Sequence, residues 1–272
     1  MQYKSKHKAL RGILVTLLVV LLLACSFGVG VKFGSPIERW FNDMFSIGND
    51  VSSNVDFSEL KYAALGDSIT YAMDGTQGGA RMNKPYCEIV KDTLGLKSVQ
   101  NYGISGSTVC TKTNSETYSA YKPMCERYKQ MSDDFDIVSV MGGTNDYFQF
   151  ATLGTISDTD TETFYGALNV LAKGLKEKYP NAFTFFMSPI KVRNASANTS
   201  NTKRHDDICR AIKEVCAKYD ISVLDTSTRV DFSQEYNADD YTGDGVHPSQ
   251  AFHRYVLAPV IADFIRNNYK AA

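Results

Sequence analysis

Four short polar motifs in this sequence contain residue types that could transfer an acyl group. In chain order they are Gly-Asp-Ser at 66–68, Asn-Tyr-Gly-Ile-Ser-Gly-Ser-Thr at 101–108, Gly-Gly-Thr-Asn-Asp at 142–146 and Asp-Gly-Val-His-Pro at 244–248. A serine hydroxyl is a weak nucleophile that needs an adjacent base, and His247 can take the proton of Ser68. Asp244, three residues before the histidine, can bond the other ring nitrogen and stabilise the imidazolium. We therefore predict a catalytic triad of Ser68, His247 and Asp244.

The same motifs contain donors for an oxyanion hole. The backbone N–H groups of Ser68 and Gly106 and the side-chain amide of Asn145 can bond the negative oxygen of an acyl-transfer intermediate. Taken alone, Ser68 is better explained as a helix N-cap and Asn145 as a turn residue. The occurrence of all these residues together, in this order, favours catalysis.

Other polar residues near the motifs have simpler interpretations. Asp67 and Asp146 are expected to organise their loops through hydrogen bonds to the backbone rather than to react. His205 and His253 lie on predicted helices, so we expect them to be surface or core residues and not ligands.

The elements that must position these motifs are short strands alternating with helices. The predicted strands cover 61–65, 98–102, 136–141, 183–187 and 221–224, and the predicted helices cover 85–94, 161–179, 202–219 and 249–268. Short apolar runs without alternation are typical of a parallel sheet that is buried on both faces. In such open α/β sheets, sites lie at the carboxyl ends of the strands, where the first three motifs follow.

The motifs resemble the sequence blocks of the SGNH hydrolase superfamily, also called GDSL esterases and lipases. The resemblance covers about residues 61–265. It implies a three-layer α/β/α sandwich with a five-stranded, flavodoxin-like parallel sheet, and neither a metal nor an organic cofactor. It also implies the site residues Ser68, Asp244 and His247 for the triad and Ser68, Gly106 and Asn145 for the oxyanion hole. Ile69, followed by Thr70, stands where the GDSL name implies a leucine after the serine. Ile-Thr is common at this place among the esterase members of the family. The Gly-x-Ser-x-Gly elbow of α/β-hydrolases is absent around Ser68.

The N-terminus has the features of a membrane anchor. A basic flank at 1–11 precedes 20 uncharged residues at 12–31, which would span about 30 Å as a helix. The basic flank is expected to be cytoplasmic, so the rest of the chain faces outward. A signal anchor, a lipoprotein signal with lipid on Cys25 and a cleaved signal peptide remain open, and all three export the body. We expect a stalk at 32–58 and the hydrolase domain at 59–272.

Composition argues against several other classes of protein. The 272 residues include 29 basic and 30 acidic side chains, and the net charge of −1 gives no general attraction to nucleic acid. The spacings CxxC and HExxH are absent, so no zinc site is expected. Six cysteines are too few for a scaffold built on disulfides. Cys110 and Cys125 are the best candidates for a pair, whereas Cys209 and Cys216 on one helix are too far apart.

These features together predict an exported serine esterase that removes small acyl groups, above all O-acetyl groups, from carbohydrate. The rim loops at 75–84 and 110–125 are polar, and a long apolar lid is absent, which weighs against long acyl chains. A lipase or lysophospholipase and an O-acyltransferase with the same triad remain alternatives. A non-enzymatic surface-binding module would be expected to have lost a catalytic residue, and none is lost. The sequence leaves the oligomeric state open. The aromatic residues that follow Asn145 form either a substrate platform or, as we favour, ordinary packing: Tyr147, Phe148 and Phe150.

Overall fold

The computed structural model describes residues 55–191, 199–229 and 241–270, which belong to one compact unit, Ser53–Ala272. The predicted cytoplasmic flank, the membrane segment with Cys25 and most of the predicted stalk lie outside the described residues. Within the described ranges, no helix has the length and apolar character needed to cross a membrane.

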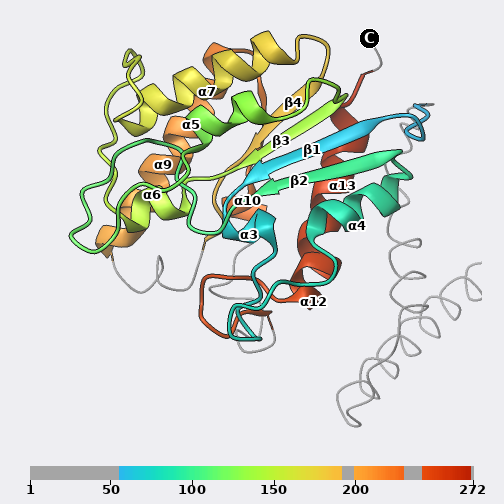
Figure 1. The fold of residues 1–272 in the computed structure, drawn as a ribbon, viewed down its shortest axis with the longest axis horizontal. Coiled ribbons are helices and arrows are strands. Elements are labelled where there is room, and N and C mark those ends of the chain that lie inside the picture. The colour runs from blue at the N-terminus through green and yellow to red at the C-terminus, as the bar shows by residue number, and fades with distance from the viewer. Residues whose placement is uncertain (1–54, 192–198, 230–240, 271–272) are drawn as a thin grey trace, which may run out of the picture. The chain divides into compact units, whose positions relative to one another are not determined.

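Five parallel strands form one sheet in the order β2-β1-β3-β4-β5 (Figure 1). The strands are β1 (Lys61–Gly66), β2 (Ser98–Gly103), β3 (Ile137–Met141), β4 (Phe183–Met187) and β5 (Ser222–Leu224). Gly66 at the end of β1 lies opposite Gly103 of β2 and Met141 of β3. The carboxyl ends of these strands therefore share one edge, as the prediction of a parallel sheet requires.

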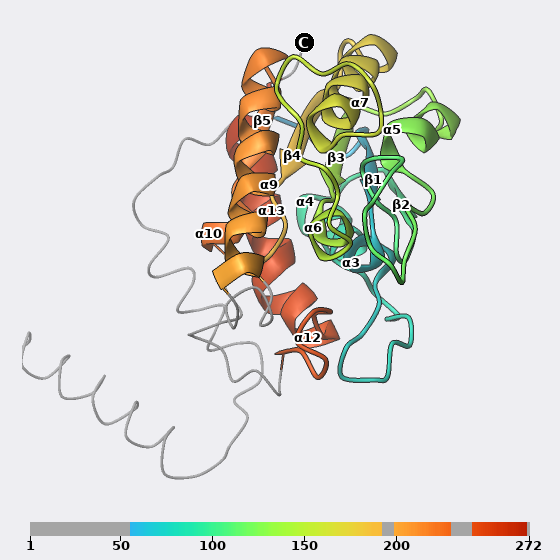
Figure 2. The ribbon, with the colours of Figure 1, turned by 90° about the vertical axis from the view of Figure 1, so that its left-hand side faces the viewer.

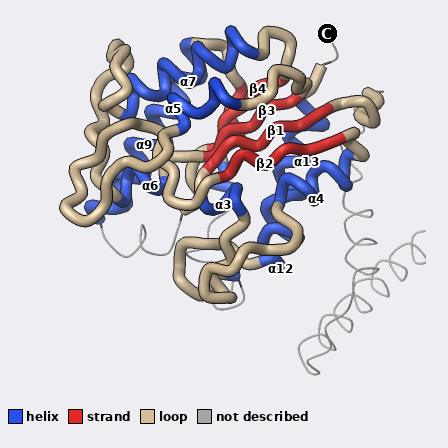
Figure 3. The backbone as a smooth tube through the Cα atoms, viewed as in Figure 1, coloured by secondary structure: helices blue, strands red, loops and turns tan. Residues whose placement is uncertain are grey.

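Helices cover both faces of the sheet (Figures 2 and 3). The first layer contains α5 (Met124–Arg127), α7 (Phe164–Lys178) and α9 (Thr199–Lys218), and the second contains α4 (Tyr86–Leu94) and α13 (Ala258–Asn268). Side chains of β1 alternate between the two cores: Ala63 and Leu65 pack in the first, Tyr62 and Ala64 in the second. This three-layer arrangement confirms the predicted α/β class and explains why the central strands β1, β3 and β4 are mostly apolar.

Short helices begin where the strands end. They are α3 (Ser68–Tyr71) after β1, α6 (Thr144–Phe148) after β3, α10 (Thr226–Arg229) after β5 and α12 (Gln250–Phe252) near the C-terminus. Three of the four polar motifs lie wholly or partly on these short helices or directly before them. The edge of the sheet therefore brings together segments that are far apart in the sequence.

The C-terminal helix differs from its prediction as one continuous element. α12 runs into a π-helical turn, His253–Leu257, before α13 begins. Pro259 in the first turn of α13 has no N–H to donate to the carbonyl of Tyr255, so regular α-helical bonding is interrupted there. The predicted helix at 161–179 is confirmed as α7, and the Thr163 side chain caps it by accepting the N–H of Gly166 at 3.2 Å.

The predicted pair of Cys110 and Cys125 is wrong. All five cysteines in the described part of the chain are free and buried. The thiol of Cys110 donates to the carbonyl of Lys112 at 3.0 Å, so it is turned toward its own loop. Burial raises the pKa of Cys125 to about 12, which leaves it a protonated core side chain.

Candidate active site

Ser68 begins α3 directly after β1. Gly66 permits this sharp turn, because a Cβ there would lie 2.0 Å from Oγ1 of Thr70. Asp67, and not Ser68, is the N-cap residue, and its side chain accepts the N–H of Ile69 at 3.0 Å. The hydroxyl of Ser68 is therefore not used for capping, and the residue is 5% exposed.

A continuous chain of hydrogen bonds joins Ser68, His247 and Asp244. Nε2 of His247 lies 2.9 Å from Oγ of Ser68, and Nδ1 lies 2.7 Å from Oδ2 of Asp244. The other carboxylate oxygen of Asp244 accepts the N–H groups of Val246 at 2.9 Å and His247 at 2.8 Å. Partial burial alone would raise the pKa of Asp244, but the hydrogen bonds from His247 lower it below its usual value. An ionised Asp244 fixes the tautomer in which Nε2 can accept the serine proton.

The loop between α3 and α4 holds the histidine segment in place. A Cβ on Gly75 would lie 2.4 Å from the carbonyl oxygen of His247, so the two backbones touch. Oδ2 of Asp74 accepts the N–H of Gln250 at 3.3 Å. The Gln250 side chain donates to the carbonyl of Lys84 at 2.6 Å and accepts its N–H at 3.2 Å. This loop includes the predicted rim at 75–84, and its contacts to Gln250 were not foreseen.

The expected oxyanion donors lie on neighbouring segments. Gly106 has a φ of +77° in the loop after β2, a conformation that glycine adopts without strain. Asn145, in the first turn of α6, donates its side-chain amide to the carbonyl of Ser107 at 2.9 Å. The structure therefore brings Asn145 against the loop that carries Gly106.

Two carboxylates and an amide tie the motifs to one another. Asp146 is fully buried and accepts the N–H groups of Val109 at 2.9 Å and Cys110 at 3.1 Å. Asn101 donates to the carbonyl of Thr70 at 2.6 Å, which links the second motif to α3. The predicted loop-organising roles of Asp67 and Asp146 are in agreement with these bonds.

Arg127 is a residue of this site that the sequence did not indicate. Its guanidinium donates to the carbonyls of Gly66 and Tyr102 at 2.5 Å each, and to that of Lys122 at 3.0 Å. It also donates to the hydroxyl of Ser107 at 3.1 Å. Burial lowers the pKa of Arg127 to about 10, which leaves it charged at neutral pH. Arg127 thus joins the ends of β1 and β2 to the loop of Gly106, and no motif surrounds it in the sequence.

The sequence from residue 64 to residue 255 matches the family model of the GDSL-like Lipase/Acylhydrolase family. The chain belongs to this family. The match spans all four motifs, and it makes the protein a serine ester hydrolase by its family. Among curated proteins, none matches the chain.

Solved structures agree with the GDSL-like fold. A crystal structure of a protein from Lactobacillus plantarum has 29% sequence identity and a TM-score of 0.66, and the match covers 80% of this chain and all of the other. A lipase/acylhydrolase from Enterococcus faecalis has 19% identity and a TM-score of 0.55, over 78% and 98% of the two chains. A carbohydrate acetylesterase family member from Sinorhizobium meliloti has 14% identity and a TM-score of 0.55, over 76% and 98%. The last two similarities bear on the fold alone.

Asp67 places a buried carboxylate next to Ser68 in this member of the GDSL-like family. Burial raises its pKa to about 6, against the opposing effects of the Ile69 N–H and of the charges of His247 and Arg127. Its Oδ2 is buried without a hydrogen-bond partner. The ionised form of Asp67 is therefore costly in the folded protein, and the positive charge of Arg127 offsets part of that cost.

The two other histidines in the described ranges are core residues. His253 accepts the N–H of Tyr86 on Nδ1 at 3.0 Å, and burial lowers its pKa to about 3. His205 lies 3.1 Å from the carbonyl of Pro189 through Nε2. Neither histidine belongs to a group of three or more His, Cys, Asp or Glu residues in the described part of the chain that could hold a metal ion.

The aromatic residues after Asn145 divide between the two predicted roles. Tyr147 is buried, and Phe148 packs against the same core, as favoured. Phe150 is 49% exposed, so the packing interpretation is wrong for this residue. Its position is a helix end, where sequence periodicity gives no reliable indication of burial.

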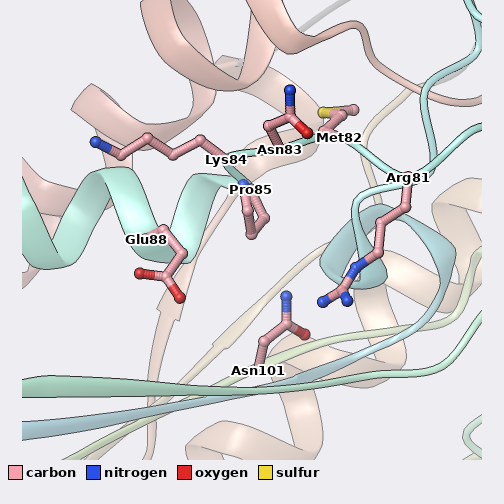
Figure 4. Close-up of a pocket in the computed structure, with 7 residues that line it drawn as sticks. All are labelled: Arg81, Met82, Asn83, Lys84, Pro85, Glu88 and Asn101. Carbon is pink, nitrogen blue, oxygen red and sulfur yellow. The ribbon is translucent and has the colours of Figure 1, made fainter.

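A polar cavity of about 730 Å³ lies beside β2, at the start of α4 (Figure 4). It is lined by Arg81, Met82, Asn83, Lys84, Pro85, Glu88 and Asn101. The triad residues are not among its lining residues. Arg81 donates to the carbonyl of Tyr71 at 3.1 Å and lies over the ring of Tyr71, so its cation is used within the fold.

Proposed function

We propose that Ser68, His247 and Asp244 hydrolyse carboxylic esters through an acyl-enzyme. The observation that carries this proposal is the unbroken chain of hydrogen bonds from Asp244 through His247 to Ser68. Ser68 attacks the ester carbonyl while Nε2 of His247 takes its proton. The imidazolium then protonates the leaving alcohol. Water, deprotonated by the same histidine, attacks the acyl-enzyme and releases the acid.

The oxyanion of each tetrahedral intermediate is bound by the N–H groups of Ser68 and Gly106 and by the amide of Asn145. Such donors act best when they are held before the substrate arrives. This role is supported by the 2.9 Å bond that holds Asn145 against the Gly106 loop. During the reaction the Asn145 amide has a second hydrogen that can reach the oxyanion.

We propose small acyl groups on carbohydrate, acetate above all, as the substrate class. The polar rim loop at 75–84 supports it, since a long acyl chain needs apolar surface. The Sinorhizobium meliloti carbohydrate acetylesterase family member, which shares the fold, is in agreement with this substrate. The apolar segment at 12–31 further supports export, with the enzyme anchored by that segment, attached by lipid on Cys25, or secreted.

The test is hydrolysis of p-nitrophenyl esters from acetate to palmitate by the full-length chain. We expect activity to peak at acetate, and to disappear in Ser68→Ala together with labelling by a fluorophosphonate. Ser58→Ala is the matched control, because this exposed serine precedes the amino end of β1, whereas Ser68 follows its carboxyl end, and the change should leave activity unchanged. A peak at palmitate would replace the acetylesterase by a lipase. Labelled Ser68 without hydrolysis would indicate an acyltransferase, and retained activity in Ser68→Ala would refute the triad.

A further inference from the structure

Exposed hydrophobic side chains gather beside the oxyanion hole. In the described ranges, the large exposed ones are Tyr118 (66%), Tyr121 (50%), Phe150 (49%), Ile156 (42%) and Tyr255 (55%). All but Tyr255 lie in two loops, at 104–123 and 149–163. These loops follow the segments that carry Gly106 and Asn145. Single exposed apolar residues need no explanation, but three aromatic side chains in the loops next to the proposed catalytic centre do. Ile156 is not part of this group, because its carbonyl accepts from the side chains of Asn169 on α7 and of Lys218 at the end of α9.

Hydrogen bonds join the two loops into one surface. The N–H of Asn114 donates to the carbonyl of Gln149 at 3.1 Å, and its side-chain amide donates to the carbonyl of Phe150 at 2.9 Å. Further along, the N–H of Thr111 donates to the carbonyl of Thr161 at 2.8 Å. Figure 1 shows the loop after β2 passing alongside α6.

Tyr121 lies directly against the oxyanion loop. Its carbonyl accepts the N–H of Thr108 at 3.2 Å. Its ring carbon Cδ1 lies 3.9 Å from the position that a Cβ on Gly106 would occupy. A half-exposed aromatic face therefore borders the residue expected to bind the oxyanion, within reach of a group attached to the reacting ester.

Phe150 is presented to solvent by an unfavourable backbone conformation. It follows the end of α6 with a φ of +57°, in the left-handed region where glycine is preferred and a bulky residue is strained. The guanidinium carbon of Arg204 lies 4.0 Å from the centre of its ring, which helps to hold the ring in place. Strain maintained at a functional site is evidence for a role of the exposed ring.

The chemistry of the two loops matches a sugar better than an acyl chain. The three exposed hydrophobic residues of this group, Tyr118, Tyr121 and Phe150, are all aromatic. Between them stand hydroxyl and amide side chains, at Thr113, Asn114, Ser115, Thr117 and Ser119. Aromatic faces supply flat apolar area at low entropic cost, and hydroxyls and amides supply adaptable hydrogen bonds. The C–H face and the hydroxyl rim of a pyranose ring need both.

We propose that Tyr121, with Tyr118 and Phe150, forms a subsite that stacks a pyranose ring of an O-acylated glycan. This inference rests on the proposed function, because an acetyl group is too small to reach the loops. The group that reaches them is then the alcohol part of the ester. Tyr121 is the specificity-determining residue, since its ring borders Gly106.

The experiment compares two kinds of acetate ester with the full-length chain. The probes are O-acetylated oligosaccharides of xylan, cellulose and chitin type, and triacetin, which has no ring. We expect the wild type to prefer at least one oligosaccharide over triacetin in kcat/KM. Tyr121→Ala should reduce that preference about tenfold, mainly through KM, as expected for one lost stacking contact. Tyr121→Phe should retain it, because the ring remains.

Tyr255→Ala is the matched control, since Tyr255 is equally exposed but lies on the π-helical turn, and it should leave both activities unchanged. An unchanged preference in Tyr121→Ala, or no preference in the wild type, would overturn the subsite. A loss confined to long-chain esters would make these loops an acyl-binding surface and overturn it as well. Absence of hydrolysis of every acetate ester tested, the oligosaccharides and triacetin alike, would instead refute the proposed function.

Discussion

Replacement of Arg127 by lysine separates the geometry of the guanidinium from its charge. The arginine fork reaches the carbonyls of Gly66 and Tyr102, which end two adjacent strands, and the carbonyl of Lys122 in the following loop. A lysine has a single ammonium nitrogen at the end of a flexible chain and lacks the planar fork of arginine. It therefore cannot bond all three carbonyls. Arg127→Lys therefore loses at least one of the charged hydrogen bonds that the guanidinium makes to these carbonyls.

The expected cost follows from these bonds. A hydrogen bond to a charged group contributes about 1.5–3 kcal/mol. With one such bond lost, the free energy of unfolding should fall by about 1.5–3 kcal/mol. The same change removes a hydrogen bond from the hydroxyl of Ser107, and the carbonyl of that residue accepts the Asn145 amide at 2.9 Å. Complete loss of one oxyanion donor lowers kcat about a hundredfold or more. Because Arg127→Lys weakens the positioning of Asn145 without removing it, we expect kcat for p-nitrophenyl acetate to fall about tenfold or more.

Urea unfolding and steady-state kinetics measured on the same preparation check both numbers. Arg254→Lys is the control, because Arg254 is exposed on the π-helical turn and its replacement should change stability by about 0.5 kcal/mol at most. If Arg127→Lys unfolds at the same urea concentration as the wild type and keeps its kcat, the guanidinium does not hold the strand ends and the reasoning fails.

Three further changes test the site. Asn145→Ala should lower kcat about a hundredfold or more in steady-state assays. A change in KM alone would make Asn145 a binding residue. Gly75→Ala should reduce both kcat and the rate at which a fluorophosphonate labels Ser68, because its Cβ would lie 2.4 Å from the His247 carbonyl; unchanged labelling and kcat would contradict this. Asp67 has a folded pKa raised to about 6, so the wild type should lose stability as pH rises from about 4 to 6. Asp67→Asn should remove up to about 3 kcal/mol of that loss in urea titrations, and parallel pH profiles of the two proteins would contradict it.

The main features of the fold and the triad could be predicted because they follow from local patterns. Short apolar runs indicated the parallel strands, and parallel strands share a carboxyl edge. Asp244 and His247 are three residues apart, so one loop can join them, and Ser68 follows a strand end. These relations need no knowledge of distant contacts.

The features that were missed depend on contacts between distant segments. Arg127 bonds carbonyls, which every residue has, so no sequence pattern marks its partners. The two hydrogen bonds between the Gln250 side chain and the backbone of Lys84 join residues that are 166 positions apart. The pairing of Cys110 with Cys125 failed because proximity across a loop does not orient two thiols toward each other.

The bond between His247 and Ser68 also determines when the enzyme becomes active during its synthesis. The two residues are 179 positions apart, so the nucleophile leaves the ribosome long before its base. Contacts of such large sequence separation form late in folding. A chain that ends before residue 244 contains the nucleophile but neither Asp244 nor His247. The proposed mechanism therefore makes nascent and truncated chains inert, with hydrolysis beginning only when the C-terminal segment has docked against the loop of Gly75.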